Sequence, residues 1–244
     1  MSNNKKIGQS NSLRLFIWFA ATILPIILLA KGIYGSFLFT FSMPLLWQIG
    51  LRREPFSSLG LKRKSSRASI ITGFITGVVI ALLCGKILSI LGMTGYTLSG
   101  LHKLELSFGF FKLSFPLQKE LAYRLLTTSN TLKGAFLYLF FSILVIGLGE
   151  ELFWRGFIQQ KISKHFSKNL SIWLTAILFG LTHFYIFLIL PIKGGIIFLA
   201  AIAVIGAIWG YLFAYFNNIW GSAVCHGVVA FIIWKYFFFS PLLK

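Results

Sequence analysis

The amino-acid sequence predicts an all-α protein, a polytopic integral membrane helix bundle of about seven transmembrane helices plus one interfacial amphipathic helix. Composition is the first reason, because 57% of the residues are hydrophobic and only 11% are charged. Soluble domains carry about half apolar and a quarter charged residues. Hydropathy is the second reason, with a mean value of +0.83. The third is that the apolar residues form separate runs of roughly 20, the length that crosses a bilayer.

The charge distribution agrees with a membrane protein. The net charge is +18, but the Lys and Arg residues lie mostly between the apolar runs. This pattern indicates membrane topology and contact with anionic lipid headgroups, and not nucleic-acid binding. The basic segments 52–67 and 161–168 are expected on the cytoplasmic side, together with the N-terminus. Cys84 and Cys225 lie in apolar runs and are interpreted as buried free thiols.

Three spans are expected in the N-terminal half. A disordered cytoplasmic N-terminus and the three spans are predicted at residues 1–12, 13–30, 33–51 and 68–91. The third span carries glycines near helical spacing, which indicates close helix packing: Gly73, Gly77 and Gly85. Basic residues interrupt residues 92–130 too often for a span. Residues 116–126 begin with proline and repeat leucine every four positions, which predicts an amphipathic helix at the interface.

Four spans are expected in the C-terminal half, at residues 132–160, 170–190, 195–216 and 219–239. The first of them is longer than the hydrocarbon core requires, so it is expected to tilt or to project from it. We expect a single membrane domain with a catalytic core at residues 131–244, preceded by the N-terminal spans, the basic loop and the interfacial helix at residues 13–130.

The most unusual stretch of the chain is a charged cluster inside the fourth expected span. Only five residues are acidic, all of them glutamate, and two of these are the adjacent Glu150 and Glu151. Ionised groups near a bilayer centre cost at least about 2.5 kcal/mol each, so they need partners or a function. Glu151 and Arg155 are i, i+4 neighbours and are expected to pair. Glu150 points about 100° away and has no partner on its own helix.

Two histidines are expected at the same depth as the glutamates. Counting 1.5 Å per residue from the middle of each apolar run puts His183 and His226 within roughly 5 Å of the midplane. His102 and His165 lie in polar segments and are expected at the surface. Glu150 with two histidines fits a hydrolytic site with a glutamate base. A proton relay in a small transporter and a polar network that only locks helix packing are the alternatives.

The order of three motifs resembles the CAAX protease and bacteriocin-processing family (the CPBP or Abi-type family) of intramembrane glutamic endopeptidases. The motifs are Glu150 to Arg155, Phe179 to His183, and His226. The resemblance implies that Glu150 and His183 activate water for attack on a peptide carbonyl, and that His226 stabilises the oxyanion. Glu151 and Arg155 would orient the site. The family has asparagine or aspartate four residues after this last histidine, where this chain has Ala230.

The resemblance implies a peptide or membrane-anchored protein as the substrate, no nucleic-acid partner, and the plasma membrane of a bacterium as the location. No cofactor is expected; a zinc site is the less favoured alternative, because HExxH is absent. Ala230 supplies no hydrogen-bond donor, and Asn217 and Asn218 at the helix entrance are not expected to replace it. An impaired family member that acts by binding, in bacteriocin immunity or as a scaffold, is therefore a further alternative.

Overall fold

The computed structural model describes residues 55–90, 104–108, 111–115, 131–183, 192–233 and 235. Several expectations lie outside these residues: the N-terminus 1–12, the spans at 13–30 and 33–51, the interfacial helix 116–126, and His102. The division of the chain at residue 131 stays a prediction.

Three helices in the described part of the chain are long and apolar enough to cross a membrane. They are α3 (Ser66–Ile90), the continuous helix from Leu132 to Ile162, and α9 (Ile192–Phe216). Two shorter apolar helices are α8 (Lys168–Leu181) and α10 (Trp220–Ile232). The five helices match the third to seventh expected spans and confirm the all-α class. A total of seven spans stays a prediction.

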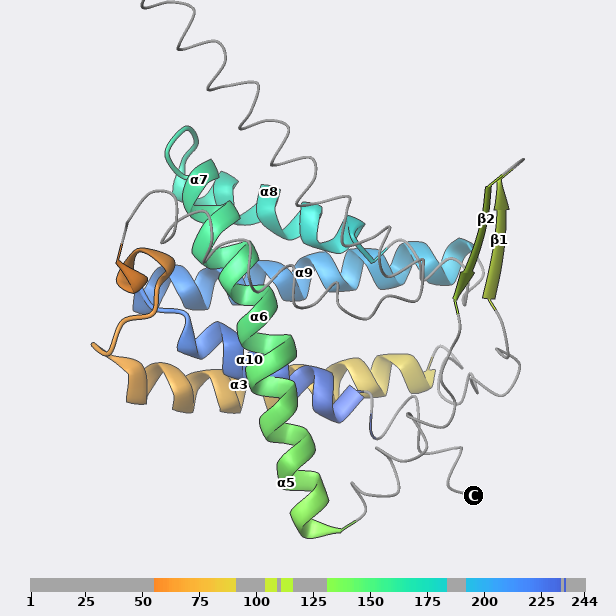
Figure 1. Cartoon of the computed structure of the whole chain (residues 1–244), viewed down its shortest axis with the longest axis horizontal. Coiled ribbons are helices and arrows are strands. Elements are labelled where there is room, and N and C mark those ends of the chain that lie inside the picture. The colour runs from red at the N-terminus through yellow and green to blue at the C-terminus, as the bar shows by residue number, and fades with distance from the viewer. Residues whose placement is uncertain are drawn as a thin grey trace, which may run out of the picture.

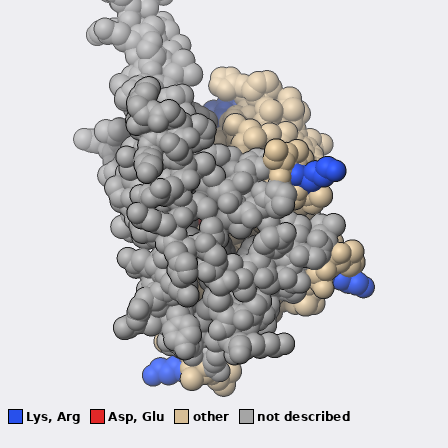
Figure 2. All heavy atoms as spheres, turned by 90° about the vertical axis from the view of Figure 1, so that its right-hand side faces the viewer, with Lys and Arg blue, Asp and Glu red and all other residues tan. Residues whose placement is uncertain are grey.

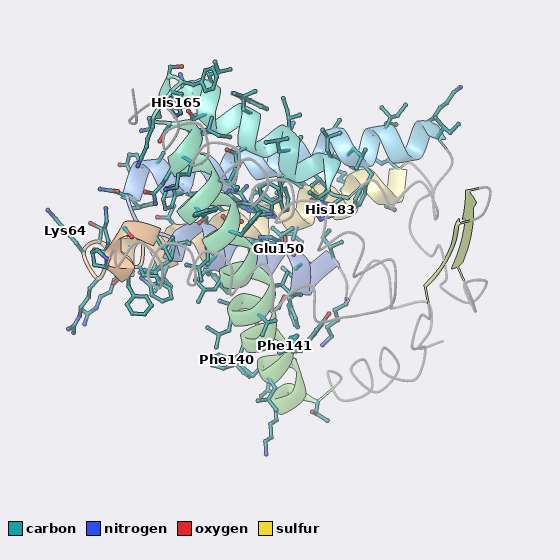
Figure 3. All side chains as sticks on the ribbon, turned by 45° about the horizontal axis from the view of Figure 1, so that its top comes forward. Lys64, Phe140, Phe141, Glu150, His165 and His183 are labelled. Carbon is teal, nitrogen blue, oxygen red and sulfur yellow. The ribbon has the colours of Figure 1, made fainter. Side chains whose placement is uncertain are left out.

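Large apolar side chains point outward from these helices. Ile71 and Leu82 on α3 are each 60% exposed, and Phe136 and Phe140 near the start of the long helix are 65% and 62% exposed. Phe140 and Phe141 point away from the bundle in Figure 3. In water this would be a large apolar patch, which soluble monomers rarely expose. In a bilayer the same side chains face lipid tails.

The long helix consists of five consecutive pieces: α5 (Leu132–Phe141), η4 (Ser142–Gly147), α6 (Leu148–Glu151), η5 (Leu152–Gln159) and α7 (Gln160–Ile162). The Thr131 side chain accepts a hydrogen bond from Gly134 N and so caps the first turn. The pieces η4 and η5 are π-helical, a rare geometry that is frequent at functional sites. The long helix crosses steeply over α9 and α10 (Figure 1).

A short hairpin adds to the helices. Strands β1 (Leu104–Phe108) and β2 (Phe111–Phe115) are antiparallel, with Leu104 opposite Phe115. The hairpin lies beside the helices in Figure 1. It falls in the segment for which the sequence predicted no span. Leu and Phe alternate with Glu, Lys and Ser in part of it, and such alternation is the two-residue period of a strand.

Glycines bring α3 and α10 into close contact, as the sequence predicted for Gly73 and Gly77. A Cβ on Gly73 would collide with the Gly221 carbonyl, and one on Gly77 would lie 2.9 Å from the Cys225 carbonyl oxygen. Small residues allow this approach and give the helices a large shared contact surface. The α3 helix thereby packs closely along α10.

The two basic segments meet at one end of the bundle. Lys62 Nζ donates a hydrogen bond to Asn217 Oδ1 (2.8 Å), and Lys168 Nζ donates one to the Ala214 carbonyl (3.4 Å), both near the end of α9. Lys64 and His165 lie on this side of the molecule in Figure 3, and His165 is exposed, as expected. Figure 2 shows the opposite end, where the visible Lys and Arg side chains of the described residues are well separated. The arrangement fits the positive-inside pattern.

Candidate active site

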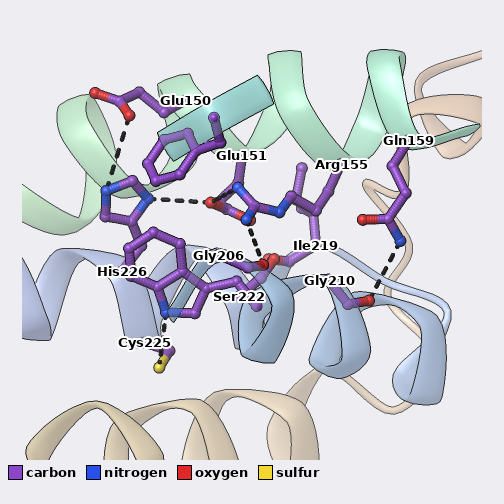
Figure 4. A network of polar contacts seen from close by, with 12 residues as sticks. Glu150, Glu151, Arg155, Gln159, Gly206, Gly210, Ile219, Ser222, Cys225 and His226 are labelled. Atoms are coloured by element: carbon purple, nitrogen blue, oxygen red, sulfur yellow. Dashed lines mark hydrogen bonds and ion pairs between the residues drawn. The ribbon is translucent and has the colours of Figure 1, made fainter. Parts of the chain in front are cut away.

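The predicted pair of Glu151 and Arg155 is present and fully buried. Arg155 Nη1 donates a hydrogen bond of 2.6 Å to Glu151 Oε1, and both side chains are 0% exposed (Figure 4). A charge-assisted bond of this kind is roughly twice as strong as a neutral one. The pairing compensates two charges that the bundle interior could not hold singly.

The helix α9 and the aromatic core hold the other side of the Arg155 guanidinium. Arg155 Nη2 donates a hydrogen bond of 2.6 Å to the Gly206 carbonyl. The guanidinium carbon lies 5.2 Å from the Phe179 ring centre and 5.4 Å from that of Trp209. Cations at this distance from aromatic faces are attracted by the ring quadrupole. Arg155 therefore connects the long helix to α8 and α9.

A second contact of the same kind lies one helical turn further along. Gln159 Nε2 donates a hydrogen bond of 3.3 Å to the Gly210 carbonyl. Arg155 and Gln159 are four residues apart, and so are their acceptors Gly206 and Gly210. A Cβ on Gly210 would lie 2.9 Å from Gln159 Oε1, and one on Gly206 would lie 3.3 Å from Arg155 Nη2. The two glycines thus let polar side chains reach the backbone of α9.

His226 lies between the two carboxylates. Its Nδ1 is 3.0 Å from Glu151 Oε1, and its Nε2 is 3.9 Å from Glu150 Oε2 (Figure 4). The Glu150 side chain is 15% exposed, whereas that of Glu151 is fully buried. The two adjacent glutamates therefore differ in environment. Glu151 is buried and contacts both Arg155 and His226, whereas the Glu150 side chain is partly exposed.

The indole of Trp209 covers the His226 ring. The two rings stack with centroids 3.9 Å apart and planes 14° apart. Trp209 is itself fixed, because its Nε1 donates a hydrogen bond to Cys225 Sγ (3.2 Å) and its side chain is buried. Cys225 thus contacts Trp209 and points away from its neighbour His226, as expected for adjacent residues of a helix. The stack and the Glu151 contact together define the plane of the imidazole.

A close contact between η4 and α10 fixes the position of His226 relative to the long helix. A Cβ on Gly147 would lie 3.0 Å from Gly227 N and would collide with the Ala223 carbonyl. Gly227 in turn leaves no room for a side chain against Ile143. Ser142 Oγ donates a hydrogen bond of 2.9 Å to the Gly227 carbonyl. Gly147 lies about one turn before Glu150 and Glu151 on the long helix, so this contact brings His226, next to Gly227, to the two glutamates.

His183 lies just beyond the end of α8. Its Nδ1 is 3.0 Å from the Phe179 carbonyl, and its ring centre is 4.8 Å from that of Phe179. The Phe179 ring also contacts His226, at 5.8 Å. Glu150 and His183 lie in the central part of the bundle in Figure 3. The structure thus brings the five predicted site residues into one region.

The contribution of α9 was missed at the sequence level. The site was expected among the fourth, fifth and seventh spans, but α9, the sixth, supplies Trp209 and the carbonyls of Gly206 and Gly210. The available signal was the Gly-x-x-x-Gly spacing of residues 206–210, which marks close contact between membrane helices. Trp209 gave no signal, because an isolated tryptophan in an apolar run is typical of a core residue.

The contacts of Asn218 agree with the expectation that it does not replace the donor missing at Ala230. Asn218 is buried at the start of α10, where its Oδ1 accepts hydrogen bonds from Ser69 Oγ (2.7 Å) and Trp220 N (3.2 Å). Its Nδ2 donates a hydrogen bond to the Lys64 carbonyl (3.1 Å). These contacts fix the start of the helix, so Asn218 has a structural role away from the carboxylates.

Among the described residues, no group of three or more His, Cys, Asp or Glu is placed to hold a metal ion. The absence of a cofactor stays a prediction.

The geometry of these residues defines a class of protein. It is a helical membrane protein with two carboxylates, an imidazole and a guanidinium in contact inside an apolar bundle. Intramembrane hydrolases and proton-coupled transporters both use such sites.

The family model for the Rce1-like type II CAAX prenyl endopeptidases matches residues 132–232. This segment runs from the first residue of α5 to the last residue of α10 and contains all five site residues. The match confirms the resemblance to the CAAX protease family, which is a family of peptidases. Neither the curated proteins nor the solved structures gave a match.

Proposed function

We propose that this protein is an intramembrane endopeptidase in which Glu150 activates a water molecule for attack on a peptide carbonyl. The observation that carries the proposal is the position of Glu150 Oε2, 3.9 Å from His226 Nε2 in the bundle interior. This separation is too long for a direct hydrogen bond. One water oxygen can, however, lie within hydrogen-bond distance of both atoms, which places the water beside the general base and next to the imidazole that would later face the oxyanion.

Glu151 acts through His226. An ionised carboxylate only accepts hydrogen bonds, so the contact with Glu151 Oε1 assigns a proton to His226 Nδ1. This leaves His226 Nε2 directed toward Glu150, ready to bind water when neutral or to donate to an oxyanion when protonated. Arg155 holds Glu151 in place. We assign Glu151 and Arg155 as positioning residues and His226 as the oxyanion stabiliser.

His183 serves as the partner of Glu150 in this mechanism. Its ring packs against Phe179 at the end of α8, and the same Phe179 ring contacts His226, the neighbour of Glu150. A histidine there can share the proton that Glu150 removes from water and then deliver it to the leaving amine. The remaining step, loss of the amine from the tetrahedral intermediate, needs this proton.

The substrate that we propose is a peptide or a membrane-anchored protein segment. Members of the matched family are described as prenyl endopeptidases, so a lipid-modified C-terminal segment is the first probe. The meeting of two basic segments at one end of the bundle supports a cytoplasmic location for that end. The plasma membrane of a bacterium is the proposed location.

The central test is the Glu150→Gln variant of the full-length protein in proteoliposomes. The probe is an internally quenched peptide with a farnesylated CAAX terminus, and cleavage is followed by fluorescence and mass spectrometry. Loss of a general base should lower kcat by about 10²-fold or more. Glu105→Gln makes the same chemical change on strand β1 and should leave cleavage unchanged. Cleavage by Glu150→Gln within twofold of the unmodified protein would contradict the assignment.

Ala230 supports a second candidate function, a binding role without cleavage, because it offers no donor where the family has one. A binder in bacteriocin immunity or a membrane scaffold needs the shape of the site and not its base. In cells, Glu150→Gln should then keep the full phenotype of the unmodified protein. The same variant abolishes the phenotype if cleavage is the function, so one experiment separates the two.

A further inference from the structure

A groove of about 770 Å³ lies on the side of α9 that faces away from the Glu150 site. One wall is formed by Thr72 and Thr76, one turn apart on α3, and the other by α9 residues that include Ile208 and Leu212. Lys168, the first residue of α8, also lines it. Most of the exposed surface of the groove is apolar, and the Lys168 side chain lies at one end of it.

The cation lies in a strongly basic environment. Lys168 is exposed, and its Nζ lies 3.4 Å from the Ala214 carbonyl. Lys62 Nζ is hydrogen-bonded to Asn217 Oδ1, less than one turn further along the chain. Residues 55–67, 161–168 and 214–220, which form this end of the bundle, contain no acidic residue, and Glu54 is the single acidic residue of the basic segment 52–67. The end of the groove therefore attracts an anion, and nothing acidic within these segments offsets that attraction.

The dimensions suit a lipid tail. From Phe216, at the end of α9, back to Ile208 the helix rises about 12 Å, at 1.5 Å per residue. This is roughly the length of the upper half of an acyl chain. Thr72 and Thr76 face the groove, while the neighbouring Gly73 and Gly77 face α10. The groove is thus a separate surface from the contact between α3 and α10.

We propose that the groove binds one anionic phospholipid, with its phosphate at Lys168 and one acyl chain along Ile208 and Leu212. A ligand for this groove needs a negative head at the basic end and an apolar tail in the membrane, and an anionic phospholipid has both. A lysine near the phosphate should favour an anionic over a zwitterionic headgroup by about fivefold. The inference goes beyond proteolysis, because the groove shares no side chain with the Glu150 site.

The experiment measures lipids that stay bound to the purified full-length protein. Nanodiscs with equal amounts of phosphatidylglycerol and phosphatidylcholine are analysed by native mass spectrometry. The unmodified protein should retain phosphatidylglycerol about fivefold over phosphatidylcholine, and Lys168→Gln should reduce the ratio to about one. Lys164→Gln, a change of the same kind on an exposed lysine outside the groove, should keep the ratio. Equal losses in both variants would show diffuse electrostatics and overturn the proposal.

A second variant tests the groove without changing any charge. Thr76→Trp fills the apolar wall and should reduce bound phosphatidylglycerol at least fivefold, whatever the effect of Lys168→Gln on folding. Full retention of the lipid by Thr76→Trp would overturn the acyl-chain position. Glycerol phosphate, an analogue of the lipid headgroup without acyl chains, should not compete with phosphatidylglycerol for the groove at millimolar concentration. Competition by it would show that only an anion is recognised and would equally overturn the lipid assignment.

Discussion

Replacing Arg155 by methionine should lower the free energy of unfolding by about 3 to 5 kcal/mol. Methionine keeps an unbranched side chain of similar length, so the loss is chiefly polar. Arg155 makes two hydrogen bonds of 2.6 Å, one to Glu151 and one to the Gly206 carbonyl. Bonds to charged groups contribute about 1.5 to 3 kcal/mol each. Their loss leaves Glu151 fully buried, with His226 as its remaining hydrogen-bond partner in the described part of the chain.

His226 should reduce the loss of stability that Arg155→Met causes. Its Nδ1 is 3.0 Å from Glu151 Oε1, so a protonated His226 can replace part of the positive charge that Arg155 supplied. This places the expected value near the lower limit, about 3 kcal/mol. Removing both charges, in the Arg155→Met and Glu151→Gln double variant, should cost less than the sum of the single changes by about 2 kcal/mol, since no buried charge is left alone.

Equilibrium unfolding in mixed detergent micelles, followed by tryptophan fluorescence, measures these differences. Lys164→Met on the exposed loop is the matched control and should change stability by less than about 0.5 kcal/mol. If the two single changes add to the double variant within about 0.5 kcal/mol, Glu151 and Arg155 do not stabilise one another, and the reasoning fails.

Three further predictions concern the same site. Trp209→Leu should lower kcat for the farnesylated probe about tenfold at unchanged KM, because His226 loses its stacking partner, while Trp209→Phe keeps most activity. Gly147→Val should separate η4 from the Ala223 carbonyl, which a lowered thermal unfolding temperature and a fall in folded yield would show; an unchanged temperature would refute this close crossing. Ala230→Asn, which restores a donor, should raise cleavage at least tenfold. Ala230→Leu should not, and an equal effect of both would dismiss the donor explanation.

The helices of the described part could be located from apolar runs alone, because a bilayer requires about 20 apolar residues of any span. The expected span 195–216 and the observed α9, Ile192–Phe216, end at the same residue. The contact of Glu151 with Arg155 was equally accessible, because both residues lie on one helix whose geometry fixes their separation.

Contacts between helices could not be predicted from apolar runs or from the geometry of a single helix. That His226 lies between both carboxylates depends on the rotation of α10, which the close approach at Gly147 and Gly227 sets. Packing glycines were expected only on α3, so the contact at Gly147 and Gly227 was not predicted. The π-helical turns around α6 also change which side chains point together, and they leave no periodic signal in an apolar segment.

The matched contacts of Arg155 with Gly206 and of Gln159 with Gly210 constrain how the bundle can move. A shear of α9 along the long helix by one residue would misalign both hydrogen bonds at once and bring a Cβ toward each polar side chain. Large shear motions need interfaces that tolerate sliding, and this one does not. We therefore expect the long helix and α9 to move together. A conformational change that admits a polypeptide is then expected in elements around this pair, such as the end of α8 that carries His183.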